Sequence, residues 1–106
     1  MTLSRQKYST PSLHVRIFRD SNFSGVELFG STFVNVRGEA INFSNSIITD
    51  TCFNGSNLKK ASFCGARLSN VDVSVCNLSG AMLESISLSR VNLAVSKISR
   101  DEGKVL

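Results

Sequence analysis

The chain has few side chains of the kinds that carry out catalysis, and their spacing matches none of the common catalytic sites. His14 is its single histidine, and no serine, cysteine or carboxylate pattern around it indicates a triad or an acid–base pair. Cys52, Cys64 and Cys76 are odd in number and include no closely spaced pair of the kind that binds zinc. We therefore expect no enzyme activity, no metal and no cofactor, with free thiols in a reducing cytosol.

Composition indicates a small globular domain. The chain has 106 residues, of which 42% are hydrophobic and 19% charged, and its formal net charge is +4. No apolar run reaches the length that a membrane-spanning helix needs. The first residues lack the continuous apolar stretch of a secretory signal, so we expect neither a membrane span nor a signal peptide.

Large apolar residues recur at every fifth position, and this spacing must position all other side chains. Stepping by five from Leu13 to Ile98 gives eighteen such centres, and all but Gly38 are large and apolar. Neither the period of a strand nor that of a helix explains this spacing. The positions two before the centres, from Ser21 to Ser96, hold only Ala, Ser, Thr, Cys, Val or Ile. Each unit of five therefore turns one large and one small side chain inward and three outward.

Units of five residues cannot bury their own apolar faces, so they must stack into a solenoid with a shared core. From Phe23 to Leu68 the centres alternate between phenylalanine and other residues, which is a period of ten. In a coil of twenty residues, phenylalanine centres lie above other phenylalanine centres, and aliphatic centres above aliphatic ones. A coil of fifteen residues would instead place phenylalanine and aliphatic centres above one another. We therefore predict an all-β solenoid whose coils are square and contain twenty residues each.

Two features of the repeat bear on the corners and the core. Gly38 removes one central side chain, and the neighbouring small inward positions hold the larger Val36 and Ile41. We expect these two to fill part of the space, because an empty cavity of that size costs on the order of a few kcal/mol. Glycine also recurs two positions after a centre, which predicts a tight turn with positive φ. These glycines are Gly25, Gly30, Gly55, Gly65 and Gly80.

Units such as SNFSG, ARLSN and CNLSG resemble those of the pentapeptide-repeat proteins, whose consensus is A-(D/N)-L-x-x. The resemblance covers Ser21 to Arg100. It implies the family's fold, a right-handed quadrilateral parallel β-helix with four units to a coil, and so about four coils here. We accordingly divide the chain into an N-terminal cap segment (residues 1–20), the β-helix (21–100) and a C-terminal tail (101–106).

One side of the predicted prism is basic. The face built on the centres at positions 38, 58, 78 and 98 holds five of the seven basic residues of the β-helix, against one acid, Glu39. A basic face favours an acidic partner, whether a protein, a nucleic acid or a phospholipid surface. The predicted interaction face consists of Arg37, Lys59, Lys60, Lys97 and Arg100.

The resemblance leaves two classes of function open. The best-known activity in the family, protection of DNA gyrase and topoisomerase IV against quinolones, is attributed to an acidic prism that resembles DNA. A chain with a net charge of +4 does not match that surface. Other members act in immunity, developmental regulation or as secreted effectors. We expect a non-catalytic, cytoplasmic protein-interaction module, with a secreted effector as an alternative location. The alternative function is a nucleic-acid-directed protein, which either contacts DNA through the basic face or guards a topoisomerase.

The last coil predicts a second contact surface. Its floor is formed by Leu83, Leu88, Leu93 and Ile98. The few residues after this coil are too short for a useful helical cap, and an uncovered coil presents unpaired strand edges. We therefore expect a homodimer joined through the C-terminal coils about a two-fold axis, as in relatives that dimerise in this way. Two alternatives stay open: the tail folds back as a plug, or the chain belongs to a longer array.

Overall fold

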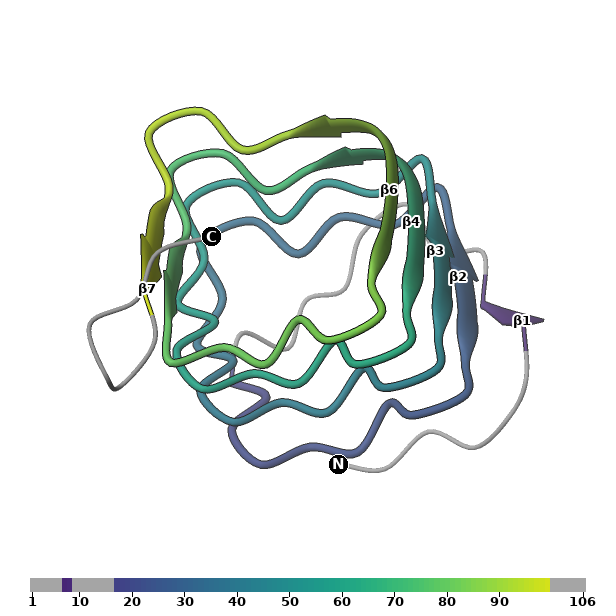
Figure 1. The fold of residues 1–106 in the computed structure, drawn as a ribbon, viewed down its shortest axis with the longest axis horizontal. Coiled ribbons are helices and arrows are strands. Elements are labelled where there is room, and N and C mark those ends of the chain that lie inside the picture. The colour runs from purple at the N-terminus through teal and green to yellow at the C-terminus, as the bar shows by residue number, and fades with distance from the viewer. Residues whose placement is uncertain (1–6, 9–16, 100–106) are drawn as a thin grey trace.

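The computed structural model describes residues 7–8 and 17–99, and these residues form a four-sided solenoid without a helix (Figure 1). It follows that no helix in the described part of the chain is long and apolar enough to cross a membrane. All strand pairs are parallel, in one sheet of order β1-β2-β3-β4-β6 and a second sheet of β5 and β7. The strands are β1 (Lys7–Tyr8), β2 (Glu27–Phe29), β3 (Ile47–Thr49), β4 (Arg67–Asp72), β5 (Asn77–Ser79), β6 (Ser87–Asn92) and β7 (Lys97–Ser99).

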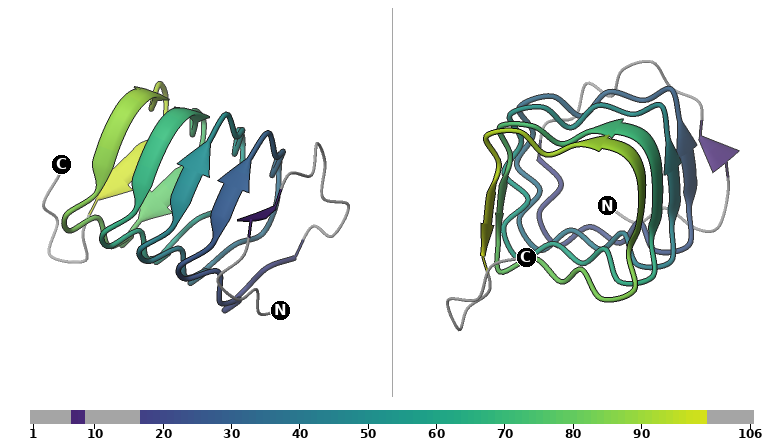
Figure 2. Two further views of the ribbon diagram at one scale, coloured as in Figure 1. Left: turned by 90° about the vertical axis from the view of Figure 1, so that its right-hand side faces the viewer. Right: turned by 45° about the horizontal axis from the view of Figure 1, so that its top comes forward.

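Every parallel pairing joins residues twenty positions apart, and this fixes the length of one coil. In the larger sheet Leu28 pairs with Ile48, and Ile48 pairs with Leu68. Isolated bridges extend the same register to the other sides of the coil, for example from Thr32 to Cys52. The predicted quadrilateral β-helix with twenty-residue coils is therefore confirmed, and Figure 2 shows the coils stacked along the prism.

A residue in the left-handed conformation makes each corner. Between Asp20 and Val95, φ is positive at every fifth residue, namely at the five glycines predicted to do so and at eleven other residues. At ten corners the N–H of the following residue donates to the carbonyl of the centre, as Val26 does to Phe23 at 3.4 Å. This bond, together with positive φ at the third residue, is characteristic of a type II turn. Glycine therefore marks some of the corners, but the fold does not require it at all of them.

Phenylalanine rings form the middle of the core. The rings of Phe33 and Phe53 stack with their centroids 5.1 Å apart, and those of Phe43 and Phe63 stack at 5.4 Å. Phe23 instead meets Phe43 edge-on, with an interplanar angle of 73°. Phenylalanine therefore lies above phenylalanine in both columns, as predicted. Among these pairs, the rings lie nearly parallel only in Phe33–Phe53 and Phe43–Phe63. Six rings are at most 2% exposed: Phe18, Phe23, Phe33, Phe43, Phe53 and Phe63.

The space above Gly38 is filled by its neighbours. A Cβ atom added to Gly38 would lie 3.1 Å from Leu58 Cδ2 and 3.6 Å from Ile41 Cγ2. Both of these side chains are fully buried, and Val36 is buried as well. Ile41 therefore takes up part of the space, as expected. Leu58, which follows one coil later, contributes a contact that the sequence alone did not indicate.

Inward hydroxyl and thiol groups join successive coils. The Ser56 hydroxyl accepts a hydrogen bond from the Val36 N–H at 3.1 Å and donates one to the Phe33 carbonyl. One coil later, the Cys76 thiol donates to the Phe53 carbonyl at 3.0 Å. Burial raises the pKa of the Cys76 thiol, so the group keeps the proton that it donates. The small inward positions therefore supply polar bonds as well as volume.

Phe43 tests the assignment of inward and outward positions. Its ring is fully buried against those of Phe23 and Phe63. We expect Phe43→Ala to lower the free energy of unfolding by about 3–5 kcal/mol, because the core cannot refill the space. Asn45 is exposed and left-handed, a conformation that aspartate also adopts, so Asn45→Asp should cost less than about 1 kcal/mol. Urea unfolding measures both variants, and equal losses would contradict the assignment.

Ser56 tests the inward polar bonds. We expect Ser56→Ala to lower the free energy of unfolding by about 1–3 kcal/mol, since it leaves the buried Val36 N–H without its acceptor. Ser56→Cys should cost less, because Cys76 makes the equivalent donor bond one coil later. The same urea titration compares the two variants. An alanine variant as stable as the wild type would show that the hydroxyl contributes nothing.

Candidate interaction surfaces

The predicted basic face is present on one side of the prism. Arg37 pairs with Asn57, Asn57 with Asn77, and Asn77 with Lys97, so these four residues form one column across successive coils. Lys59 follows Asn57 by two residues, and Lys60 makes the next corner with a φ of 60°. Four of the predicted residues are therefore brought together, all of them exposed: Arg37, Lys59, Lys60 and Lys97. Arg100, the fifth, lies outside the described residues.

Glu39 places a carboxylate inside this face. Its Oε1 atom is 3.6 Å from Arg19 Nε, and its Oε2 atom accepts a hydrogen bond from Asn57 Nδ2 at 3.4 Å. The twenty-residue register puts Glu39 between Arg19 and Lys59. Both side chains of the ion pair are partly exposed, so the pair contributes only about 0–1 kcal/mol. Its larger effect is on the surface, because the carboxylate places one negative charge among the bases of this face.

Two residues of this face were missed from the sequence because residues 1–20 were assigned to the N-terminal cap. Arg19 belongs to the face through its ion pair with Glu39. Ile17 pairs with Arg37 in the parallel register and is 57% exposed, so it adds an apolar contact point. Both lie in the segment that we assigned to the N-terminal cap. The five-residue count already included Phe18, which is buried, so assigning the residues beside this centre to the face would have found them.

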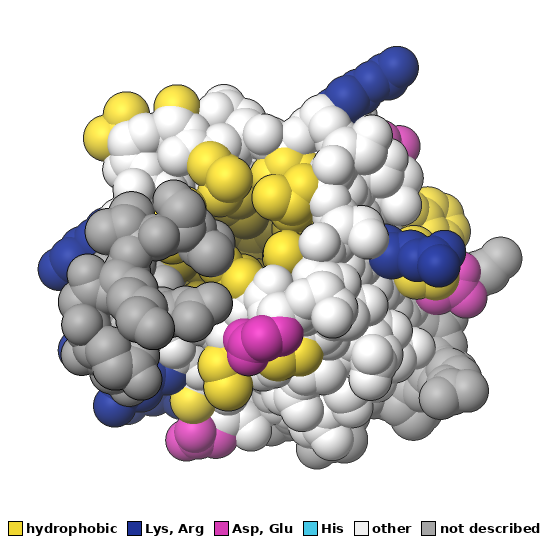
Figure 3. Space-filling model, in the orientation of Figure 1, with side chains coloured by type: hydrophobic (Ala, Val, Ile, Leu, Met, Phe, Trp, Pro, Cys, Tyr) yellow, Lys and Arg dark blue, Asp and Glu magenta, His cyan; other side chains and the backbone are white. Residues whose placement is uncertain are grey.

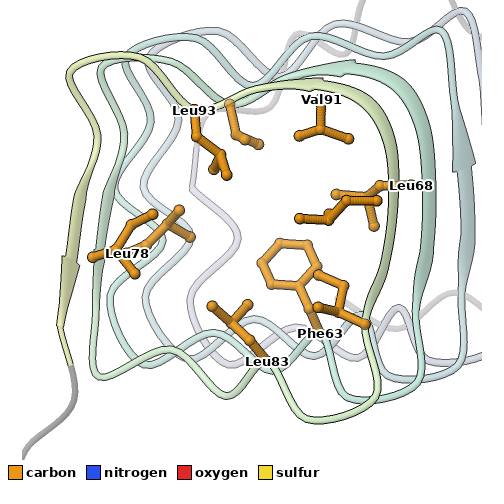
Figure 4. Close-up of a pocket in the computed structure, with 10 residues that line it drawn as sticks. Phe63, Leu68, Leu78, Leu83, Val91 and Leu93 are labelled. Carbon is orange, nitrogen blue, oxygen red and sulfur yellow. The ribbon is translucent and has the colours of Figure 1, made fainter. Parts of the chain in front are cut away.

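An apolar hollow opens at the C-terminal end of the prism (Figure 3). The four residues predicted for this end line it, together with side chains of the same coil and of the preceding one (Figure 4). Leu68 is only 4% exposed, whereas Leu88, its partner in the last coil, is 49% exposed. The lining consists of Phe63, Leu68, Val73, Leu78, Leu83, Ile86, Leu88, Val91, Leu93 and Ile98. The end therefore presents the core itself to any partner.

The backbone edge around this hollow offers both donors and acceptors. Within the body, the N–H of a centre donates to the carbonyl nineteen residues later, as Phe63 does to Met82 at 2.8 Å. In the described part of the chain, Leu88 and Leu93 have no residue at that distance to accept from them. The carbonyl of Ile86 similarly has no described residue that could donate to it. Such an edge is suited to pairing with another strand.

The residues considered for catalysis or metal binding are not brought together. Cys76 is buried, Cys52 and Cys64 are half-buried, and all three are free thiols. Cys64 Sγ lies 3.9 Å from a carboxylate oxygen of Glu84. Within residues 7–8 and 17–99, no three His, Cys, Asp or Glu side chains are placed to hold a metal ion. His14 lies outside the described residues.

Solved structures share this architecture at low sequence identity. A pentapeptide repeat protein from a Cyanothece cyanobacterium, Rfr23, is 24% identical with a TM-score of 0.70, over 91% of this chain and 63% of that one. A pentapeptide repeat protein of the Arabidopsis thaliana thylakoid lumen is 22% identical with a TM-score of 0.52, over 85% of this chain and 63% of that one. HetL, a pentapeptide repeat protein from a Nostoc strain, is involved in heterocyst differentiation regulation. It is 13% identical with a TM-score of 0.51, over 99% of this chain and 57% of that one.

These likenesses establish the fold and leave the activity open. The chain spans about three fifths of the length of each of these structures. None of the curated proteins matches its sequence. A family model of pentapeptide repeats matches residues 21–59 and 56–93, with eight copies. With the five-residue spacing, the twenty-residue register and this match over most of its length, the chain belongs to the pentapeptide repeat family.

Proposed function

We propose that this protein is a non-catalytic interaction module that binds an acidic protein surface through its basic face. Pentapeptide repeat proteins are generally interaction modules rather than enzymes. The observation that supports the proposal is the gathering of four exposed bases on one side of a rigid prism: Arg37, Lys59, Lys60 and Lys97. A fixed array of like charges raises the association rate with a surface of opposite charge and helps to set its orientation.

Three details favour a protein over a nucleic acid as the partner. The Glu39 carboxylate lies among the bases, where it would repel a continuous run of phosphates. Ile17 supplies an exposed apolar side chain on the same side, and protein interfaces combine apolar and charged contacts. Binding of single-stranded nucleic acid commonly uses aromatic side chains for base stacking. Among the described side chains, the large exposed aromatic is Phe29, which lies in β2 on another face.

Charge reversal tests the face with a matched control. We expect Lys59→Glu/Lys60→Glu to weaken binding of an acidic partner by about tenfold or more, because paired contacts become repulsive. Arg67→Glu/Arg90→Glu changes the net charge equally and also includes one left-handed corner residue, but the two positions lie on β4 and β6. This control should bind nearly as well as the wild type. Affinity capture from the source cells, followed by titration of the recovered partner, measures the difference.

The same experiment separates the alternatives. Equal affinity of the two double variants for the recovered partner would contradict a role for the basic face. Titration with a labelled DNA duplex at two salt concentrations tests the alternative function. Binding to DNA that depends steeply on salt and is lost in the Lys59→Glu/Lys60→Glu variant would replace the protein partner with a nucleic acid.

We also propose that two copies of the chain associate through their last coils. The hollow at this end is lined by apolar side chains, and covering it would bury surface that is now in contact with water. The edge carries donors and acceptors in alternation, so it can pair with an identical edge that runs in the opposite direction. Such an interface is isologous and closes as a dimer.

A charge in the hollow tests the dimer. Leu93→Lys should give monomers, because the ammonium group would be buried in the apolar interface. Ser89→Lys adds the same charge at an exposed position of β6 and should leave the dimer intact. Sedimentation equilibrium at micromolar concentrations measures the mass of each. A wild-type protein that sediments as a strict monomer would rule out this association.

A further inference from the structure

One column of side chains on the basic face offers only hydrogen-bond donors to a partner. Arg37 pairs with Asn57, Asn57 with Asn77, and Asn77 with Lys97, so the four side chains follow one another in successive coils. The guanidinium and ammonium groups at the two ends carry N–H donors and no acceptor. We call these four residues the donor column, which has a cation at each end and two amides between them.

The two amides are held with their N–H groups available. Asn57 Oδ1 accepts a hydrogen bond from the Lys59 N–H at 3.1 Å, and Asn77 Oδ1 accepts one from the Ser79 N–H at 3.0 Å. Because each amide oxygen bonds to its own turn, the Nδ2 group is the one left for other partners. Asn57 Nδ2 makes a long bond of 3.4 Å to Glu39 Oε2. Among the described residues, no acceptor bonds to Asn77 Nδ2, and both side chains are half-buried.

The same position of the repeat is occupied differently on the other three sides of the prism. On one side Asp72 follows Cys52, on another Glu27 precedes Ile47, and on the third Met82 follows Ser62. Each of these columns therefore contains a carboxylate or a side chain without an N–H donor. Within the described β-helix, an unbroken series of donors is a property of the basic face.

The spacing of the donor column selects the kind of acidic surface that fits it. Neighbouring strands of a sheet lie about 4.8 Å apart, and successive paired coils share this spacing. Residues on one side of a single extended strand repeat at about 6.6 Å. Residues four apart on a helix repeat at about 6 Å. A single strand or a helix would lose the match within the four positions, whereas the adjacent strands of a sheet keep it.

We propose that the donor column recognises a column of carboxylates on adjacent strands of a partner's β-sheet, with Asn57 and Asn77 as its central contacts. The inference rests on the basic face proposed above and names the kind of protein surface that this face binds. Carboxylates carry only acceptors when ionised, so each can accept from the donors that it meets. Glu39 does not interrupt the column, because it lies two residues from Arg37 and is paired with Arg19 at 3.6 Å.

Two synthetic acidic probes test this preference. An alternating valine–glutamate peptide assembled into β-sheets presents glutamates at the strand spacing, whereas poly-glutamate at neutral pH presents the charge without a sheet. We expect the protein to bind the sheets about tenfold or more tightly per glutamate. Asn77→Asp should remove most of this preference, since it replaces an amide donor with a negative charge. The turn should persist, because Asp72 Oδ1 accepts from the Ser74 N–H at 2.9 Å in the same position of the repeat.

Asn42→Asp is the matched control. Asn42 is half-buried and its Oδ1 accepts from the Ser44 N–H at 2.9 Å, but it lies on another side of the prism. The variant has the same net charge as Asn77→Asp and should bind the sheets within about threefold of the wild type, since salt screens a distant charge.

The outcomes separate the donor column from the basic face as a whole. Sheets bound no more tightly than poly-glutamate, or Asn77→Asp and Asn42→Asp variants of equal affinity for the sheets, overturn the recognition of a carboxylate column. The basic face still stands in that case if Lys59→Glu/Lys60→Glu weakens binding to both probes. Wild-type affinity of this double variant for both probes overturns the basic face, and the donor column with it.

Discussion

The pairing of backbone groups between coils twenty residues apart is the interaction on which the rest of this molecule depends. Each side of the square is too short to form stable structure by itself, so its N–H and C=O groups are satisfied by the coils before and after it. The register holds four corners in line and places each centre above another centre. The phenylalanine columns and the flat outer faces exist because this register is constant along the described β-helix.

The same constraint makes the sides and the end of the prism physically different surfaces. A side displays outward residues whose backbone is already paired, so only its side chains can attract a partner. A partner of the basic face around Lys59 and Lys60 would therefore be attracted through charge, at long range and with a dependence on salt. The end exposes the core and an edge of the backbone ladder. A partner at this end would be held through apolar contact and strand pairing, which have short range and require matching shape.

Several residues depart from what local preference would choose, and tertiary contacts account for most of them. Gly38 lacks a central side chain, but Leu58 and Ile41 take up the space. Ser56 puts a hydroxyl into the core, where two backbone groups of the preceding coil bond to it. Val75 and Val95 are different, since no packing within the subunit compensates for their left-handed backbone. Both valines are exposed corner residues in the last two coils of the described β-helix.

The five-residue spacing was enough to predict the class of fold, the length of a coil, and the inward position of residues such as Phe43. These properties are periodic, so they follow from counting along the chain together with the requirement that apolar side chains be buried. Counting also placed four bases on one side of the prism, namely Arg37, Lys59, Lys60 and Lys97. This follows because residues twenty positions apart lie above one another in successive coils. Which atoms meet was decided by the tertiary structure. The ion pair of Arg19 with Glu39 and the hydroxyl bridge at Ser56 depend on side-chain directions and on neighbours about twenty residues away. The spacing predicts which coil a side chain lies next to. The distance and orientation of the groups that it contacts there are set only when the coils stack.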